Sequence, residues 1–328
     1  METKRIVSAS PHFRAPETTQ SLMLNVVLAL LPAVVAAAVL FGWQTLVVIA
    51  TAVIASVGFE WLYCKLLKKA NPIGDLSAVV TGLILALNMP APGEDLAISM
   101  MMAVVGSLIA IVVVKQLFGG LGMNFANPAL VGRIALFSGY TGYMTKWVFP
   151  DAAVDQLASA TPLQVGNPAK LSLVDLLFGV HGGTMGEVCI IAILIGFVYL
   201  VATHTISPVI PVTYVGTVFV LDLIAGMGLR GSLVNILSGG LIFGAVFMAT
   251  DYVTSPFTLK GKLVFGLGLG LLTFAIRTWA NMAEGVSFAI LLMNLLVPYI
   301  NDLTVQTPYG YVKPGKTKAK AEKEDSDK

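Results

Sequence analysis

The chain has 328 residues, of which 56% are hydrophobic and 12% are charged, and its net charge is +2. Soluble proteins average roughly 45–50% apolar and 25% charged residues, so the composition predicts an integral membrane protein in a lipid bilayer. The small net charge, with no basic cluster on an aromatic-rich face, argues against a nucleic-acid partner. Two cysteines without metal-ligand spacing argue against a disulfide framework, a metal site or an iron–sulfur cluster held by this chain alone.

Apolar runs predict an all-α protein with about ten transmembrane helices, near residues 22–41, 45–64, 76–90, 97–117, 126–140, 187–203, 209–228, 232–249, 262–279 and 285–300. The polar first 20 residues do not resemble a cleavable signal. The third span is short and ends in N-M-P-A-P-G at 88–93, and the eighth runs directly into T-D-Y-V-T-S-P at 250–256. We therefore expect the third and eighth spans to be broken.

The basic residues predict the orientation, because cytoplasmic loops of membrane proteins are enriched in lysine and arginine. With the N-terminus inside, the cytoplasmic loops hold Lys4, Arg5, Arg14, Lys65, Lys68, Lys69, Lys115, Lys260, Lys262 and the tail lysines, and the outer loops hold Lys146, Lys170, Arg230 and Arg277. We expect both termini in the cytoplasm and the loop around Thr161 on the extracytoplasmic side.

Short matches between the two halves predict an internal repeat. A-N-P-A at 126–129 resembles A-N-M-A at 280–283, and G-L-I at 82–84 resembles G-L-I at 240–242, at similar separations. Five spans per half would place the two copies in inverted topology. The expected organisation is a first five-span repeat over 1–140, an extracytoplasmic loop over 141–186, a second repeat over 187–300 and a largely disordered cytoplasmic tail over 301–328.

The long polar loop holds the candidate for chemistry. Loops beyond about 12–15 residues are usually functional or disordered, and this one carries considerable apolar surface. Within it lies Ser159-Ala160-Thr161-Pro162, where small neighbours and the following proline expose the Thr161 hydroxyl. No nearby base would activate that hydroxyl, so Thr161 is a plausible acceptor of a transferred group but not a self-contained catalyst. An ordinary loop threonine is the alternative.

Several motifs together resemble one family. They are S-A-S-P-H at 8–12, N-P-A at 127–129, S-A-T-P-L at 159–163 and A-T-D-Y-V-T-S-P at 249–256, in this order among ten spans. The chain resembles the D subunits of Rnf complexes and the paralogous B subunits of sodium-translocating NADH:quinone oxidoreductases, from about residue 8 to residue 300.

This resemblance implies a covalent flavin. In the family, a flavin transferase attaches FMN through its phosphate to the threonine of this loop motif. Thr161 would be the attachment residue, with Ser159, Ala160 and Pro162 as its recognition context; Ala160 stands where many relatives have glycine. The resemblance also implies a second, non-covalent flavin in the membrane part. Trp147, Phe149, Lys146 and Lys170 are candidate neighbours of the loop flavin, although solvated surface lysines are the simpler alternative.

By the same resemblance, the chain is a translocase subunit in a bacterial or archaeal cytoplasmic membrane. It would relay electrons between ferredoxin and NAD and couple this relay to sodium or proton transport. The chain has no dinucleotide fingerprint and no cluster ligands. Ferredoxin and NAD chemistry would therefore belong to partner flavin and iron–sulfur subunits, with no catalytic residue in this chain.

Other readings stay open on the sequence alone. The segment 251–256 predicts either a cofactor or ion contact or a helix-terminating turn. Glu60 and Asp222 could line an ion path or pair with a basic group of a neighbouring span, and Arg133, deepest in a span, could face a flavin or a phosphate. A solute channel or transporter without a redox role, or a structural membrane anchor, would share the same span pattern.

Overall fold

The structure is a computed structural model that describes residues 17–69, 73–93, 95–148, 172–280 and 285–305. The described residues form helices and the loops between them, with one isolated bridge between Pro90 and Thr184. This confirms the expected all-α class. Thr161 and its neighbours 159–162 lie outside the described residues, as do both chain ends.

The first half contains α1 (Thr19–Phe41), α2 (Gln44–Leu66), α3 (Ser77–Leu87), α4 (Leu96–Leu108) with its π-helical continuation η2 (Ile109–Gln116), α5 (Pro128–Gly139) and the short α6 (Thr141–Met144). The Thr18 side chain caps α1 in a capping box, and Asn127 caps α5 ahead of a proline at its first position. Both are favoured starts of helices.

The second half begins with the short α7 (Leu173–Phe178) and continues with α8 (Ile190–Ala202), α9 (Val209–Ile224), α10 (Gly228–Leu237), α11 (Leu241–Phe243) with its π-helical continuation η5 (Gly244–Met248), α12 (Leu259–Trp279) and α13 (Gly285–Thr304). The ten expected spans therefore all coincide with helical segments, most within a few residues of their expected ends.

Five of the described helices are long and apolar enough to cross a membrane, namely α1, α2, α4 with η2, α12 and α13. A sixth crossing is possible if α10 and the α11–η5 segment count as one bent span. Helices α3, α5, α8 and α9 are apolar but shorter, at 10–17 residues. The chain is thus a multi-pass membrane protein in which several spans are short or broken.

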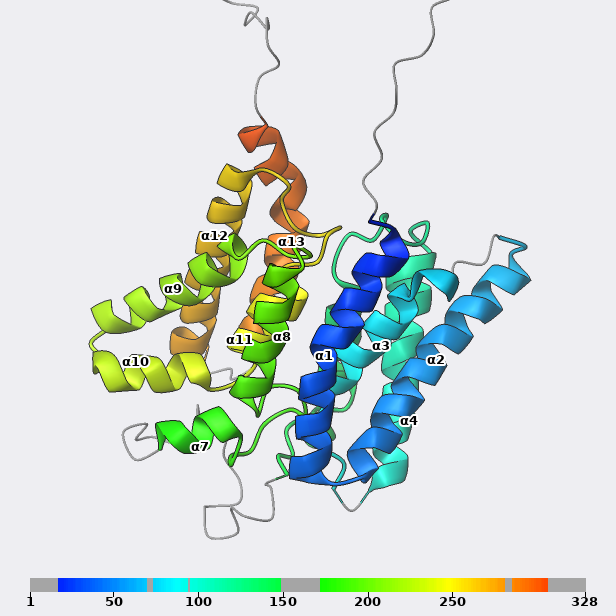
Figure 1. Cartoon of the computed structure of the whole chain (residues 1–328), viewed down its shortest axis with the longest axis horizontal. Helices are drawn as coiled ribbons and strands as arrows, with labels where there is room; N and C mark the ends of the chain where they lie inside the picture. The colour runs from blue at the N-terminus through cyan, green and yellow to red at the C-terminus, as the bar shows by residue number, and fades with distance from the viewer. Residues whose placement is uncertain (1–16, 70–72, 94, 149–171, 281–284, 306–328) are drawn as a thin grey trace, which may run out of the picture.

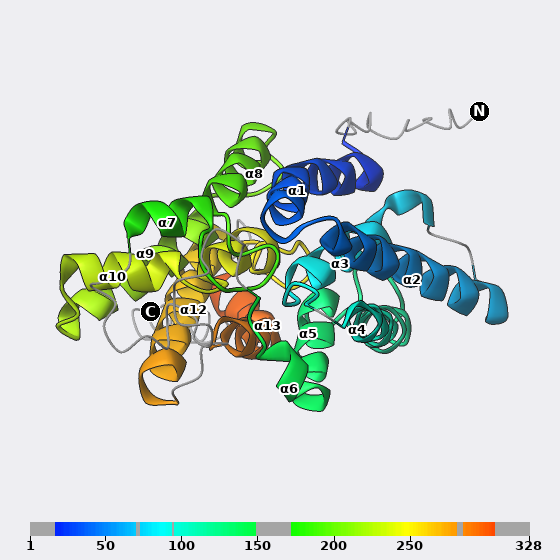
Figure 2. The same ribbon diagram turned by 90° about the horizontal axis from the view of Figure 1, so that it is seen from below.

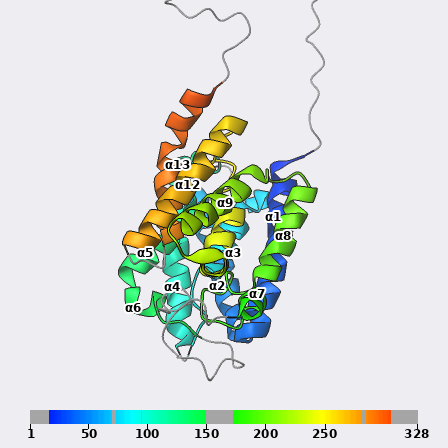
Figure 3. The ribbon, with the colours of Figure 1, turned by 90° about the vertical axis from the view of Figure 1, so that its left-hand side faces the viewer.

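The helix ends define two faces of the molecule. The start of α1 and the end of α13 both point toward the upper side of Figure 1, and we call this side the terminal face. Helices α6 and α7, which flank residues 149–171, lie at the opposite end, which we call the loop face (Figure 3). Figure 2 looks onto the loop face and shows the helices of the two halves side by side.

Both expected breaks exist, but the eighth span breaks at another place. Helix α3 has only 11 residues and gives way to extended chain through Pro90. The eighth span bends by 62° between α10 and α11, at Ser238–Gly240, rather than at its end near Thr250. Gly239 has a φ of +68°, a conformation that glycine adopts without strain, so it permits this bend.

The expected loop 141–186 contains a segment that is buried in the helical body. His181 to Val188 are all buried, and the segment runs alongside the chain that follows α3. The Met185 amide donates to the Met89 carbonyl at 3.0 Å, and the Gly186 amide donates to the Leu87 carbonyl at 2.7 Å. These bonds satisfy backbone groups that the short α3 would otherwise leave unpaired, as apolar surroundings require.

Candidate functional site

The described chain enters and leaves the loop of Thr161 on the loop face. Helix α6 precedes residues 149–171 and α7 follows them, and both lie on this face (Figure 2). The described flanks of the loop therefore lie on the face opposite the start of α1 and the end of α13, while the side of the membrane on which the loop lies stays a prediction. Among the described residues, no three His, Cys, Asp or Glu side chains gather as metal ligands would.

A cleft on the loop face includes Val148, the last described residue before the loop of Thr161. This loop-face cleft has an empty volume of about 1,040 Å³ and is lined by Pro90, Ala91, Gly93, Asp95, Ser99, Met102, Tyr143, Thr145, Lys146, Trp147 and Val148. Two of the predicted flavin neighbours, Trp147 and Lys146, are brought together here, whereas Phe149 and Lys170 lie outside the described residues. The Lys146 ammonium lies 5.2 Å from the centre of the Tyr143 ring. Aromatic and cationic groups in one cleft suit a planar ligand that carries negative charge.

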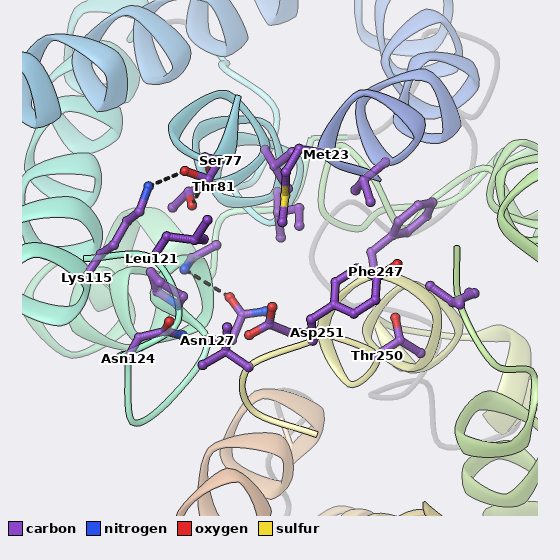
Figure 4. Close-up of a pocket in the computed structure, with 18 of the residues that line it drawn as sticks. Met23, Ser77, Thr81, Lys115, Leu121, Asn124, Asn127, Phe247, Thr250 and Asp251 are labelled. Carbon is purple, nitrogen blue, oxygen red and sulfur yellow. Dashed lines mark hydrogen bonds between the residues drawn. The ribbon is translucent and has the colours of Figure 1, made fainter. Parts of the chain in front are cut away.

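A second cavity lies toward the terminal face, between the two halves. This terminal-face pocket has an empty volume of about 750 Å³, counted together with the solvent space at its mouth (Figure 4). Its walls come from α1, α3, α5, α8 and η5 and from the segments around Leu121 and Thr250, and most of them are apolar. Its polar groups are Ser77, Thr81, Lys115, Asn124, Asn127, Thr250, Asp251 and Tyr252.

Asn127 joins the two halves at this pocket. Its side-chain oxygen accepts from the amides of Ala129 and Leu130, at 3.1 and 3.4 Å, and so caps α5. Its side-chain nitrogen donates to the Met248 carbonyl at 3.3 Å, at the end of η5. The N-P-A motif is therefore a helix start that also holds a carbonyl freed by the π-helical turn.

The segment 251–256 forms the helix-terminating turn that one of the two interpretations predicts, while the cofactor or ion contact stays a prediction. The Thr254 hydroxyl donates to the Asp251 carboxylate at 2.9 Å, which closes a turn after η5. Asp251 and Tyr252 also line the terminal-face pocket. Burial raises the pKa of Asp251, and hydrogen bonds from Thr254, Asn124 and nearby backbone amides oppose that rise.

The buried Asp251 makes stability depend on pH. Because its pKa lies above the ordinary value of 3.8, the folded chain holds this proton more tightly than the unfolded chain. Stability should therefore fall as the pH rises from 3.8 through the raised value, by up to about 1.4 kcal/mol per pH unit. Asp251→Asn should remove this part of the slope. Melting temperatures of both proteins in detergent across that range test this, and identical slopes would contradict it.

A buried ion pair lies against the terminal-face pocket. The Lys115 ammonium lies 2.6 Å from a Glu60 carboxylate oxygen, with exposed fractions of 2% and 0%. It also donates to the Ser77 hydroxyl at 2.5 Å, and Gln116 donates to the same Glu60 oxygen at 2.7 Å. For Glu60 the sequence left open an ion path or a pair with a basic group, and the structure shows the pair. Placing Lys115 in a cytoplasmic loop was wrong: it lies buried in the π-helical turn η2, where Glu60 compensates its charge.

A matching cluster lies in the second half. Asn235 donates to the Asp222 carboxylate at 2.7 Å, and Arg277 donates to the Asn235 carbonyl and side-chain oxygens at 2.7 and 3.1 Å. The residues of this cluster lie at nearly constant separations from those of the first. Asp222 follows Glu60 by 162 positions, and Arg277 follows Lys115 by the same number. Asn235 follows Ser77 by 158 positions. The two clusters therefore join the second, third and fourth spans of each half.

Arg133 lies at the meeting point of the broken spans. It donates to the Asn88 side chain, at the end of α3, and to Ser287 of α13, both at 3.0 Å. A Cβ added to Gly240 at the bend would lie 3.0 Å from Glu187 and 3.6 Å from Arg133, so Gly240 leaves room for both charged side chains. The described partners of Arg133 are protein groups that hold the two halves together; the phosphate or flavin contact predicted for it stays a prediction.

Sequence reasoning missed the terminal-face pocket as a unit. Its polar residues come from four separate segments, and only Asn127, Thr250, Asp251 and Tyr252 belong to motifs that the sequence singled out. A signal was present in Lys115: a lysine inside an apolar run, with an acidic residue in a neighbouring span, is the pattern of a buried pair.

The helical architecture and the two cavities together define a multi-pass membrane protein with broken spans, with one cavity on the loop face and one toward the terminal face. The family model described as "NQR2, RnfD, RnfE family" matches residues 6–310, and the chain belongs to this family.

Several curated relatives align over nearly the full chain. The D subunit of the Na⁺-translocating ferredoxin:NAD⁺ oxidoreductase complex of Acetobacterium woodii is 42% identical, covering 95% of this chain and 97% of the relative. The D subunit of the proton-translocating ferredoxin:NAD⁺ oxidoreductase complex of Clostridium ljungdahlii is 38% identical over 93% and 96%. The D subunit of the ion-translocating oxidoreductase complex of Stutzerimonas stutzeri is 35% identical over 90% and 93%. The expected resemblance to Rnf D subunits is thereby confirmed.

Proposed function

We propose that the chain is the flavin-bearing membrane subunit of an ion-translocating ferredoxin:NAD oxidoreductase complex, with FMN esterified through its phosphate to Thr161. The proposal is supported chiefly by the near full-length similarity to D subunits of such complexes, combined with the S-A-T-P motif in this loop. Two relatives are named for different ions, sodium and the proton, so the transported ion is left open.

The proposed topology is two inverted repeats of five spans, with both termini in the cytoplasm and the Thr161 loop outside. The clusters Glu60–Ser77–Lys115 and Asp222–Asn235–Arg277 support it, because they recur at nearly constant sequence separation. The positive-inside count supports the absolute orientation. Electron transfer with ferredoxin and NAD is assigned to partner subunits, so the chain acts only within the complex, after a flavin transferase has modified Thr161.

The loop-face cleft is the proposed place of the covalent flavin. Trp147 and Tyr143 offer flat apolar surface, and the Lys146 ammonium offsets negative charge in the cleft. The flavin supplies one-electron chemistry, while these residues hold and orient it. A phosphate ester also prevents the flavin from leaving between electron transfers. The terminal-face pocket, with Lys115, Asn124 and Asn127 among apolar walls, is the proposed place of a second, non-covalent flavin.

In-gel flavin fluorescence tests the covalent site. The purified chain should fluoresce yellow-green on a denaturing gel, and Thr161→Ala should abolish the signal while the protein still inserts in the membrane. Thr141→Ala is the matched control: Thr141 lies on the same face but does not line the cleft, and its hydroxyl bonds the Phe137 carbonyl, so fluorescence should persist. Undiminished fluorescence in Thr161→Ala would refute the assignment, and a dark wild-type band would favour a channel, transporter or anchor.

A further inference from the structure

We propose that Asp75, Ser77 and Lys115 form a proton relay from the terminal face into the terminal-face pocket, where it protonates a flavin as that flavin is reduced. This inference rests on the second flavin of the proposed function. It adds the route of the proton and the side of the membrane from which the proton is taken.

The three groups form one continuous chain of hydrogen bonds. The Ser77 hydroxyl donates to the Asp75 carboxylate at 2.5 Å and accepts from the Lys115 ammonium, also at 2.5 Å. Ser77 and Lys115 are buried and line the pocket, where Figure 4 shows their contact. Asp75 is only half-buried and follows the exposed Gly74 in the turn before α3, so it faces the water of the terminal face.

Nearby charges keep the inner end of this chain stable. Glu60 lies 2.6 Å from Lys115 and compensates the ammonium charge inside the membrane. Cys64 lies near Glu60 and Lys115 in the same cluster, and Asp251 and Tyr252 face the pocket from the second half. Lys115 thus pairs with the Glu60 carboxylate and also contacts the Ser77 hydroxyl, which connects it to Asp75.

The matching cluster in the second half argues that this arrangement serves more than helix packing. At the corresponding positions, Asp222, Asn235 and Arg277 also bind the three spans together. Arginine does not release its proton in proteins, and an amide is a poorer proton carrier than a hydroxyl. The first half instead has lysine and serine there, the groups that can pass a proton on, and these are the ones that line the pocket.

The proposed step balances. Electrons reach the flavin from iron–sulfur or flavin groups of partner subunits. For each proton delivered, one N–H bond of the Lys115 ammonium breaks and one N–H bond forms on a flavin ring nitrogen. Water at the terminal face first protonates the Asp75 carboxylate. Asp75 then gives this proton to the Ser77 oxygen, while the proton of the Ser77 hydroxyl, turned toward Lys115, passes to the lysine amine; Asp75 returns to the carboxylate and Ser77 remains a hydroxyl. Each proton placed on the flavin is therefore removed from the terminal face.

Proton-uptake kinetics in the purified complex test the relay. A pH-indicating dye follows proton uptake after mixing with reduced ferredoxin, and acid extraction of this chain, separated from its partner subunits, measures its non-covalent flavin. Ser77→Ala should retain the extractable flavin but slow the uptake on the order of 100-fold, as expected for loss of a positioned proton donor. Ser77→Thr keeps a hydroxyl and should restore the rate. Thr51→Val removes a hydroxyl that bonds the Val47 carbonyl within α2 and does not line the pocket, and should leave the rate unchanged.

The outcomes separate the relay from the flavin assignment. Wild-type uptake in Ser77→Ala with its flavin bound would overturn the relay alone. Wild-type complex without extractable flavin would overturn the second flavin and the relay together, while leaving the covalent site at Thr161 intact. Asp75→Asn tests the outer end independently if Ser77→Ala does not accumulate: slowed uptake supports the relay, and normal uptake overturns it.

Discussion

Lys115→Ala is expected to destabilise the protein by about 3–5 kcal/mol, because it leaves the Glu60 carboxylate buried without its counter-charge. Glu60 is 0% exposed, and only one of its oxygens has a hydrogen-bond partner among the described residues. Removing the ammonium leaves only Gln116 as a donor to the carboxylate. Thermal unfolding in detergent and the amount of protein in the membrane measure the loss.

Two further variants show whether the effect comes from the unpaired charge. The double variant Glu60→Gln with Lys115→Met removes both charges and should recover most of the lost stability. Lys65→Ala removes an exposed lysine of α2 that lies over the Trp61 ring, and should change stability by less than about 0.5 kcal/mol. If Lys115→Ala were as mild as Lys65→Ala, the buried pair would be contradicted.

Gly196→Ala is the second large expected effect, because Gly196 sets the approach of α8 to α1 across the two halves. An added Cβ would lie 2.3 Å from the Ala29 carbonyl oxygen, a backbone atom, and 3.0 Å from the Phe247 ring. The helices must separate to admit it, and overpacking of this kind costs about 1–3 kcal/mol. Helix propensity opposes this cost by only about 1 kcal/mol.

Gly216→Ala is the matched control for this substitution. Gly216 also lies within an apolar helix, α9, but no atom outside its own helix lies within 4 Å of an added Cβ. This variant should be neutral or slightly stabilised. Melting temperatures of the two variants, measured side by side, separate the cost of overpacking from the gain in helix propensity. Equal stability of the two variants would contradict the close contact of α1 with α8.

The sequence predicted the positions of the helices well because apolar length is a local property. The runs at 22–41 and 285–300 correspond to α1 and α13 with only small differences at their ends. The orientation from charge counting stays a prediction, because it uses only the order of spans and the lysines between them.

What the sequence could not predict depends on partners that are distant along the chain. A lysine at the end of an apolar run, such as Lys115, is expected in a loop, because long basic side chains usually reach the membrane interface. Its partner Glu60 lies in another span, so the sequence does not show that the two side chains pair. The bend at Gly239 lies inside an apolar run, so hydropathy does not reveal it. The buried segment 181–188 has a loop composition rich in glycine, and only its bonds to the chain after α3 show its place.

The repeat shows how a weak sequence signal gains support from contacts. Two short matches suggested that residues 1–140 and 187–300 correspond. The structure adds Glu60 with Lys115 and Asp222 with Arg277, pairs that differ in residue type and so leave no identical letters to align. Acidic and basic residues that recur at the same separation in both halves support the repeat even where the residue types differ.

The intact mass of this chain, taken from the purified native complex, tests the central proposal most directly. We predict a chain heavier than its sequence by one FMN less one water, with fragmentation placing the added mass on Thr161. An active complex in which this chain has the mass of its sequence alone would contradict the covalent flavin, and with it the role assigned to the loop.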